Sequence, residues 1–362
     1  MELLKNNIFV RVHLVKKITD AFKITMLIVG AVIGAGFASG REIAEMLYGN
    51  GAASYLTVIA MTAVMAVICT VVMLLAKKLR PSNVGQFNTA VFGKGAAAVD
   101  IMVLVNCFVV LAAMIAGMSG ITSRMGVGGY IILPIACAGA VFIVLKKDIS
   151  RLIKVNLVIM PIIIVVIVIV ALPFAASDGG VLAGRLRAIP ALLYVCMNLI
   201  LAVGALIRVE RIEHSSMIAG AVIASVIIGG LIWVMLAAIS ASPDAANEAM
   251  PLFALSYGRG ALTYVLRITM ILAIFTSMAI LLQTLVDWGQ SIVKNRFAAA
   301  SVIMLLAFAL SLIGFSNIIA WFYPVAGVFG IVYLAWIVGH WTLSQKTGSK
   351  RLDKVTGLQP KK

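Results

Sequence analysis

Ten apolar runs, each close to the length needed to cross a bilayer, dominate the sequence. A hydrocarbon core of about 30 Å is crossed by a helix of about 20 mostly apolar residues. Continuous runs of this length predict membrane-spanning helices rather than short alternating strands. The predicted spans are approximately 24–47, 53–76, 96–118, 129–145, 152–175, 188–207, 216–240, 262–286, 298–315 and 318–341.

The composition agrees with this interpretation of the apolar runs. Hydrophobic residues make up 63% of the chain and charged residues 12%, and the mean hydropathy is +1.12. Soluble domains contain about 25% charged residues, which form the polar shell that this chain lacks. The sequence therefore predicts an all-α polytopic membrane protein.

Basic residues gather on one side of the predicted spans. If both termini are cytoplasmic and the spans alternate, 23 of the 29 lysines and arginines fall in cytoplasmic segments. This asymmetry follows the positive-inside rule and supports an even number of spans in the cell membrane. It also accounts for the net charge of +16 without a nucleic-acid partner. We expect a cytoplasmic segment 1–23, a transmembrane domain 24–341 and a basic cytoplasmic tail 342–362.

The first span is interrupted by glycines. Four occur between Gly30 and Gly40, and the spacing of two between Gly34 and Gly36 differs from the spacing of four found on helix-packing faces. Close helix packing is the alternative explanation. A helix broken at mid-depth is favoured, since backbone freed there must line a polar cavity, as in the solute sites of transporters. The candidate solute-binding residues at the break are Val32, Gly34, Ala35, Gly36 and Phe37.

Two hydroxyl residues share one face of the eighth span. Thr276 and Ser277 lie three and four residues after Ala273, so both hydroxyls and the Ala273 carbonyl face the same side of a helix. The alternative is that each hydroxyl bonds only to the preceding turn. With the carbonyls of Gly30 and Ile33, they would supply five uncharged oxygens. Such a set suits a monovalent cation and lacks the carboxylates that Ca²⁺ prefers.

These motifs resemble those of a known superfamily. The string GAVIGAGFASGRE, which begins at Gly30, and the Ala-x-x-Thr-Ser motif of the eighth span resemble the LeuT-type fold of the amino acid–polyamine–organocation superfamily. The same string and the segment Trp321–Gly327 resemble the uncharacterised YkvI-type membrane proteins. The resemblance runs over roughly residues 20–342 and implies a five-plus-five inverted repeat of ten helices. It also implies that a sodium ion is held by Gly30, Ile33, Ala273, Thr276 and Ser277.

The inverted repeat implies that the sixth span mirrors the first and is also distorted. This span contains Tyr194 and Asn198, which are four residues apart and therefore lie on one helix face. Asn106 is an isolated amide in the third span. A buried amide without a partner costs a few kcal/mol, so these side chains either bond between helices or line a solute cavity. All three are included among the solute-binding candidates.

Charged residues follow the break. We expect Arg41, Glu42 and Glu45 on the outer half of the first span and Arg267 near the outer end of the eighth. A salt bridge from Arg267 to Glu42 or Glu45 would form an outer gate over bound solute. The alternative is that each residue snorkels to the surface. Snorkelling is also the favoured interpretation of Lys154, although in some proton-coupled superfamily members a lysine of the fifth span replaces sodium.

Together the motifs predict a secondary active transporter, with Na⁺ as the coupling ion and no organic cofactor. A helix N-terminus expected near Ala38 favours a carboxylate, so an amino acid or related small organic solute is the leading substrate. A non-pumping receptor or channel for a small nutrient ligand on the same fold is the alternative. No HExxH, GxSxG or Walker motif occurs, and we expect no enzyme. The expected partners are a small-molecule substrate and the lipid bilayer, and the oligomeric state is open.

Overall fold

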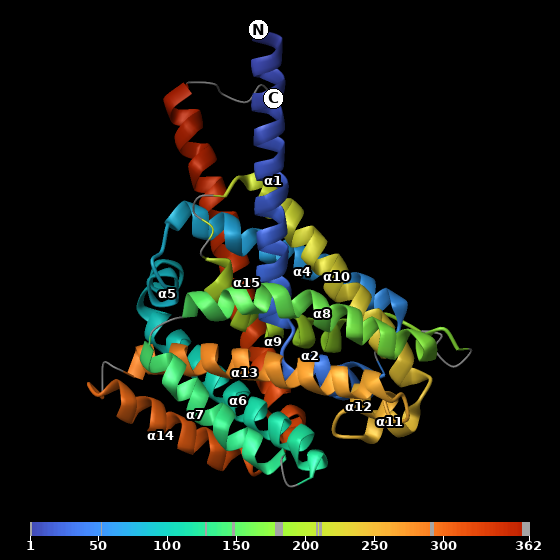
Figure 1. Cartoon of the computed structure of the whole chain (residues 1–362). Helices are drawn as coiled ribbons and strands as arrows, with labels where there is room; N and C mark the ends of the chain where they lie inside the picture. Colours follow the sequence, from blue (N-terminus) through green and yellow to red (C-terminus); the bar gives the residue numbers. More distant parts are fainter. Residues whose placement is uncertain are drawn as a thin grey trace.

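The computed structural model describes residues 2–51, 53–126, 129–146, 149–177, 184–207, 209, 212–289 and 293–356. Within these residues the regular structure is entirely helical (Figure 1). The long helices are α1 (Glu2–Val32), α4 (Tyr55–Leu79), α6 (Ala96–Thr122), α7 (Gly129–Lys146), α8 (Ile149–Ala175), α9 (Ala188–Leu206), α10 (His214–Ser240), α13 (Ala261–Gly289), α14 (Arg296–Ser311) and α15 (Phe315–Thr356). The short helical segments are α2 (Ala35–Ser39), α3 (Arg41–Ile43), the π-helix η1 (Ala44–Tyr48), α5 (Val84–Phe92), the 3₁₀ turns η2 (Gly93–Gly95) and η3 (Ser123–Met125), α11 (Pro243–Asn247) and α12 (Pro251–Leu255).

Every predicted span coincides with helix. Seven helical stretches of the described chain are long and apolar enough to cross a membrane. The two shorter apolar stretches Ile131–Leu145 and Arg296–Ser311, and the interrupted unit from α1 to η1, occupy the positions of the other predicted spans. The predicted all-helical membrane architecture is confirmed. The seven stretches are Tyr55–Leu79, Val84–Thr122, Val158–Ala175, Ala188–Leu206, His214–Ser240, Ala261–Gly289 and Phe315–Gln345.

The long helices form two packed groups joined by α8 (Figure 1). In one group α10 packs against α1 and α4, and α9 packs against the same two helices. In the other group α6, α7, α13 and α14 pack against one another. α8 contacts α10 of the first group and α13 of the second, and α15 lies against α9 and α6. The short α2 follows the end of α1 and contacts α6 and α13, so it lies where the two groups meet.

Glycine allows the helices to approach closely. A Cβ atom on Gly327 of α15 would lie 2.8 Å from the carbonyl oxygen of Leu193 in α9, and one on Gly330 would overlap the carbonyl group of Cys196. Helix association in lipid depends on such close packing, because lipid tails are as apolar as the side chains they replace. These two glycines therefore fix α15 against α9.

The two ends of α10 define the two ends of the bundle. At its start, Glu213 forms an ion pair with Lys17 of α1 (3.3 Å), and the Ser216 hydroxyl donates to the Lys17 carbonyl oxygen (3.2 Å). The first turns of α1 and the last turns of α15 project from this same end (Figure 1). α10 finishes at Ser240, directly before α11 and α12. The segment 243–255 therefore covers the opposite end of the bundle.

Candidate functional site

α1 ends at a two-residue break formed by Ile33 and Gly34. Gly34 has an extended backbone (φ −100°, ψ −170°). Its N–H donates to the Val32 carbonyl oxygen at 2.9 Å, whereas a continuing helix would require donation to Gly30. The predicted interruption of the first span is confirmed.

Beyond the break the chain changes direction repeatedly. α2 begins at Ala35, three residues earlier than expected, because Gly34 already takes the extended N-cap conformation. α2 ends at Gly40, whose φ of +80° is a left-handed conformation that favours glycine. α3 then passes into η1, where the Gly49 N–H donates to the Ala44 carbonyl oxygen five residues before it, at 2.8 Å. Single π-helical turns often occur at functional sites.

Glu42 is the centre of a buried polar cluster. Its side chain is almost fully buried, and its carboxyl group packs directly on Gly36, where a Cβ atom would overlap Oε1. The Asn198 side chain of α9 lies close enough to this carboxyl group to interact with it. Tyr194 of α9 and Tyr323 of α15 are buried within electrostatic range of it. We call these five residues the Glu42 cluster.

Several buried polar atoms in and near the cluster have no hydrogen-bond partner among the described residues. In the cluster these are Oε2 of Glu42 and the Tyr194 hydroxyl, and elsewhere in the core the amide nitrogen of Asn106 in α6 is also without a partner. Asn198 is better satisfied, because its amide also donates to the Tyr194 carbonyl oxygen at 3.0 Å. Buried polar groups are normally paired, so these atoms mark a place where a ligand or another conformation supplies partners. No hydrogen bond within the described chain joins Asn106 of α6 to the Glu42 cluster.

The remaining solute-binding candidates surround the break with apolar contacts. Val32 and Phe37 are buried in the core. A Cβ atom on Gly34 would lie 3.0 Å from Cε of Met114 in α6, so the bare backbone faces this helix. The predicted residues whose side chains lie outside the described part of the structure are Ala35 and Lys154.

The predicted cation ligands lie on two separate elements. In α13, Ala273 and Thr276 are buried, Ser277 is half-buried, and the Thr276 hydroxyl donates to the Ala273 carbonyl oxygen at 3.0 Å. At the break, no backbone N–H of the described residues donates to the carbonyl oxygen of Gly30 or Ile33. These oxygens all keep lone pairs that a cation would accept, so the donor chemistry fits Na⁺.

Arg41 links the chain that follows the break to the segment 243–255. Its guanidinium pairs with Glu45, one turn later, at 2.7 Å. It also donates to the carbonyl oxygens of Ala246 (3.4 Å) and Glu248 (3.2 Å). Gly40 packs against the backbone nitrogen of Leu252 in α12, with a Cβ distance of 3.4 Å. The segment 243–255 is therefore closed over α2 and α3.

The salt bridge predicted between Arg267 and an acid of the first span is not formed among the described residues. The Arg267 guanidinium lies over the ring of Phe253, 5.0 Å from its centroid, and 5.7 Å from that of Tyr264. Glu45 pairs with Arg41 instead, and Glu42 is turned inward toward Asn198. The physical reason is the left-handed residue before α3, which a continuous helix would not contain.

The predicted distortion of the sixth span is also wrong. α9 runs as an α-helix from Ala188 to Leu206 without a break. Pro190 lies in its first turn, where proline removes no helical hydrogen bond, and Gly204 stands alone near its end. The sequence of α9 contains no close glycine pair of the kind that unwinds the first span.

The central position of Glu42 and the contribution of Tyr323 were not anticipated. Glu42 was expected on the outer half of the first span, as an acid of the outer gate. The signal that points to its actual place is Gly40, since a left-handed residue two positions before an acid reverses its direction. Tyr323 lies in a segment that was singled out for its resemblance alone.

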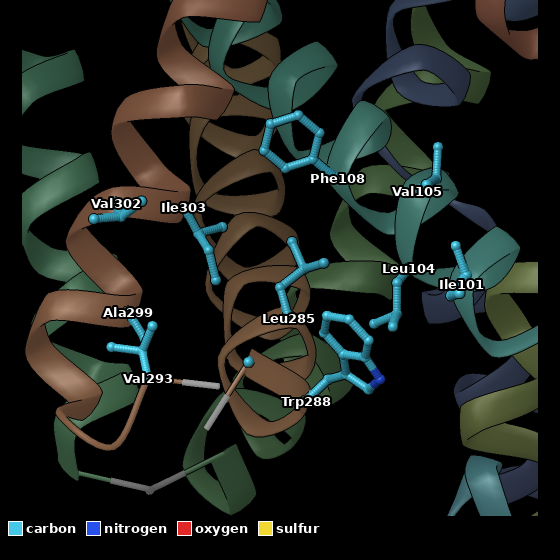
Figure 2. Close-up of a pocket in the computed structure, with 11 residues that line it drawn as sticks. Ile101, Leu104, Val105, Phe108, Leu285, Trp288, Val293, Ala299, Val302 and Ile303 are labelled. Carbon is cyan, nitrogen blue, oxygen red and sulfur yellow. The ribbon is translucent and has the colours of Figure 1, made fainter. Parts of the chain in front are cut away.

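An apolar groove lies on the outside of the bundle. This groove has a volume of about 330 Å³ and is lined by residues of α6, α13 and α14, whose side chains are drawn in Figure 2. Its walls include Phe108, Leu285 and Ile303, and its side chains are aliphatic or aromatic. Ile101 and Val302 at its edge are more than half exposed, as expected of side chains that face acyl chains. The groove therefore suits lipid rather than a polar solute.

The chain is similar to an uncharacterised membrane protein. No protein-family model matches it. It is 25% identical over 332 residues to the uncharacterized membrane protein YkvI of Bacillus subtilis (strain 168), an alignment that covers 88% of this chain and 94% of the relative. The predicted resemblance to YkvI-type proteins is confirmed.

Solved structures of the same fold have low sequence identity to the chain. An inward-facing conformation of Mhp1 matches with a TM-score of 0.63 at 13% identity, covering 89% of this chain and 76% of that one. MhsT in complex with L-phenylalanine matches with a TM-score of 0.57 at 16% identity, covering 87% and 88%. A closed Mhp1 with bromovinylhydantoin bound, described as a nucleobase-cation-symport-1 family transporter, also gives 0.57 at 14% identity, covering 86% and 77%. The chain therefore has the LeuT-type fold.

Proposed function

We propose that the chain is a secondary active transporter that couples Na⁺ to the movement of an amino acid or related small organic solute. It crosses the cell membrane ten times with both termini in the cytoplasm, in a five-plus-five inverted repeat. The observation that carries this proposal is the break at Ile33 and Gly34 beside buried polar side chains. Unwound backbone at membrane depth is stable only where it lines a site.

The coupling ion binds where α13 lies near the break. Its ligands are the carbonyl oxygens of Gly30, Ile33 and Ala273 and the hydroxyl oxygens of Thr276 and Ser277. Five uncharged oxygens compensate a single positive charge without the carboxylates that a divalent ion requires. Within the described residues no cluster of three or more histidine, cysteine or acidic side chains offers a competing metal site.

The solute binds beside the break, between the Glu42 cluster and the bare backbone of α2. Polar atoms without partners on Tyr194 and Asn106 are available to hold its polar groups. Buried Val32 and Phe37 supply apolar contacts. The amino acid in MhsT and the hydantoin in Mhp1 are small solutes held by the same fold, which supports a solute of this size.

Coupling follows from the position of the ligands on two groups of helices. The backbone donors belong to α1 and the adjoining break, and the hydroxyl donors belong to α13 in the other group. A cation that contacts both groups stabilises one relative arrangement of them over others. In this structure the segment 243–255 is closed over α2. Solute that enters from the side of this segment must therefore bind to another arrangement of the helices, in which the segment has moved away.

The ion and solute are tested together by ligand-dependent stabilisation of the purified protein. Amino acids are screened for an increase in melting temperature in Na⁺ and in K⁺. We expect stabilisation that requires Na⁺ in the wild type and is lost in the double variant Thr276→Val/Ser277→Ala. The matched control is Thr70→Val, because the Thr70 hydroxyl also bonds only to its preceding turn (2.8 Å to Ala66). Equal stabilisation of wild type and double variant contradicts the proposed ion site.

A further inference from the structure

Glu42 carries an acidic group deep inside the protein without a positive partner. Its side chain is 4% exposed, in contrast to the 35% exposed side chain of Glu45 three residues later. Glu45 pairs with Arg41 Nη2 at 2.7 Å, and Arg41 Nη1 donates to backbone carbonyl oxygens, so both terminal nitrogens of that guanidinium point away from Glu42. The Asn198 side chain lies close to the Glu42 carboxyl group, whose Oε2 atom has no partner among the described residues.

Among the described residues, the elements packed around Glu42 supply no compensating charge. α9 and α15 face it with two tyrosines, Tyr194 and Tyr323, which are neutral donors and acceptors. α2 and the stretch 217–240 of α10 contain no charged residue. The positively charged residue next to Glu42 in the chain is Arg41. Its guanidinium pairs with Glu45 and donates to backbone carbonyl oxygens. Arg267 of α13 lies on aromatic rings.

On the side of α2 the carboxyl group of Glu42 is in direct contact with Gly36, so no ion fits between the two. The carboxyl group fills the notch left by Gly36, where even one methyl group would overlap it. A carboxylate withdrawn from water without a cation or a full set of donors is unstable by several kcal/mol, and such a group takes up a proton instead.

We propose that Glu42 is a proton-binding site of the transport cycle, protonated in the closed arrangement and free to release its proton when the site opens to water. This inference rests on the proposed function and adds a second coupling ion to it. Because Glu42 sits between the break and α9, the proton and the solute occupy one region. The charge of Glu42 thus depends on which arrangement of the helices is present.

The proposal predicts how stability depends on pH. A buried acid that keeps its proton in the folded state binds more protons when folded than when unfolded, so stability falls as the pH rises. We expect the melting temperature of the wild type to fall as the pH rises from about 5 to about 9. Glu42→Gln, which resembles the protonated acid, should lack that component of the decrease. The matched control Glu45→Gln should follow the wild type.

A chemical measurement remains decisive where Glu42→Gln fails to fold. Dicyclohexylcarbodiimide is apolar and reacts with protonated carboxyl groups, so Glu42 of the wild type should be modified in detergent, more at low pH than at high pH. Peptide mapping should find no modification of Glu45, which is ion-paired. Parallel pH profiles of wild type and Glu42→Gln, or an unmodified Glu42, overturn the proposal. Neither result bears on sodium-driven uptake, which tests the proposed function separately.

Discussion

Gly36→Ala tests the packing of the Glu42 carboxyl group on the broken helix. The added methyl carbon would stand 2.6 Å from Cγ and 2.5 Å from Cδ of Glu42 and would overlap Oε1. The carboxyl end is flexible, but its burial and the nearby Asn198 side chain restrict where it can move. Overpacking of this kind costs about 1–3 kcal/mol, so the free energy of unfolding should fall by that amount.

A double-mutant cycle assigns the loss to Glu42. Glu42→Ala removes the three overlapping atoms, so Gly36→Ala should cost at least about 1 kcal/mol less in that background. Gly34→Ala is the matched control, because its new methyl group meets only Cε of Met114 at 3.0 Å, the end of a flexible side chain. The assay is equilibrium unfolding in mixed micelles of mild detergent and dodecyl sulfate. The reasoning is refuted if Gly36→Ala costs the same with and without the Glu42 side chain.

Two further predictions concern the ends of the bundle and its packing. Although desolvation raises the pKa of Glu213, the hydrogen bond and charge of Lys17 outweigh it and lower that pKa below 4.5. The ion pair therefore contributes stability above pH 4.5, and this stability is lost as the pH falls through the lowered pKa. The melting temperatures of wild type and Glu213→Gln should differ at neutral pH and converge in acid. Gly330→Ala should lower the free energy of unfolding by about 1–3 kcal/mol, because the new methyl group meets the backbone of α9, whereas Gly339→Ala, with nothing within 4 Å, should not. Equal unfolding free energies for these two variants, or a Glu213 effect that grows in acid, would contradict the structure.

Most of the fold was predictable because membrane-spanning helices leave a clear pattern of apolar residues in the sequence. Each crossing needs a long apolar run, and every run that was predicted coincides with a helix. The break in the first span was predictable for the same reason. Gly34 and Gly36 stand too close together for a packing face, and the structure uses one for an extended backbone and the other for close approach of a carboxyl group.

The site was only partly predictable, because one residue with a left-handed backbone changes the direction of the chain that follows it. Gly40 changes the direction of the chain, so Glu42 points to the centre and Arg41 to the covering segment. Glycine permits that conformation but does not require it, so the sequence alone left a continuous helix as the simpler expectation. The symmetry argument for a distorted sixth span was wrong because α9 has no glycine pair to allow it.

Uphill uptake into proteoliposomes tests the central claim most directly. Vesicles containing the purified protein receive an inward Na⁺ gradient and a radiolabelled amino acid that stabilises the protein in Na⁺. The account predicts that the solute accumulates above its external concentration, that collapse of the gradient abolishes accumulation, and that Thr276→Val/Ser277→Ala vesicles only equilibrate. A solute that binds but never accumulates under any ion gradient would contradict transport and indicate a non-pumping receptor instead.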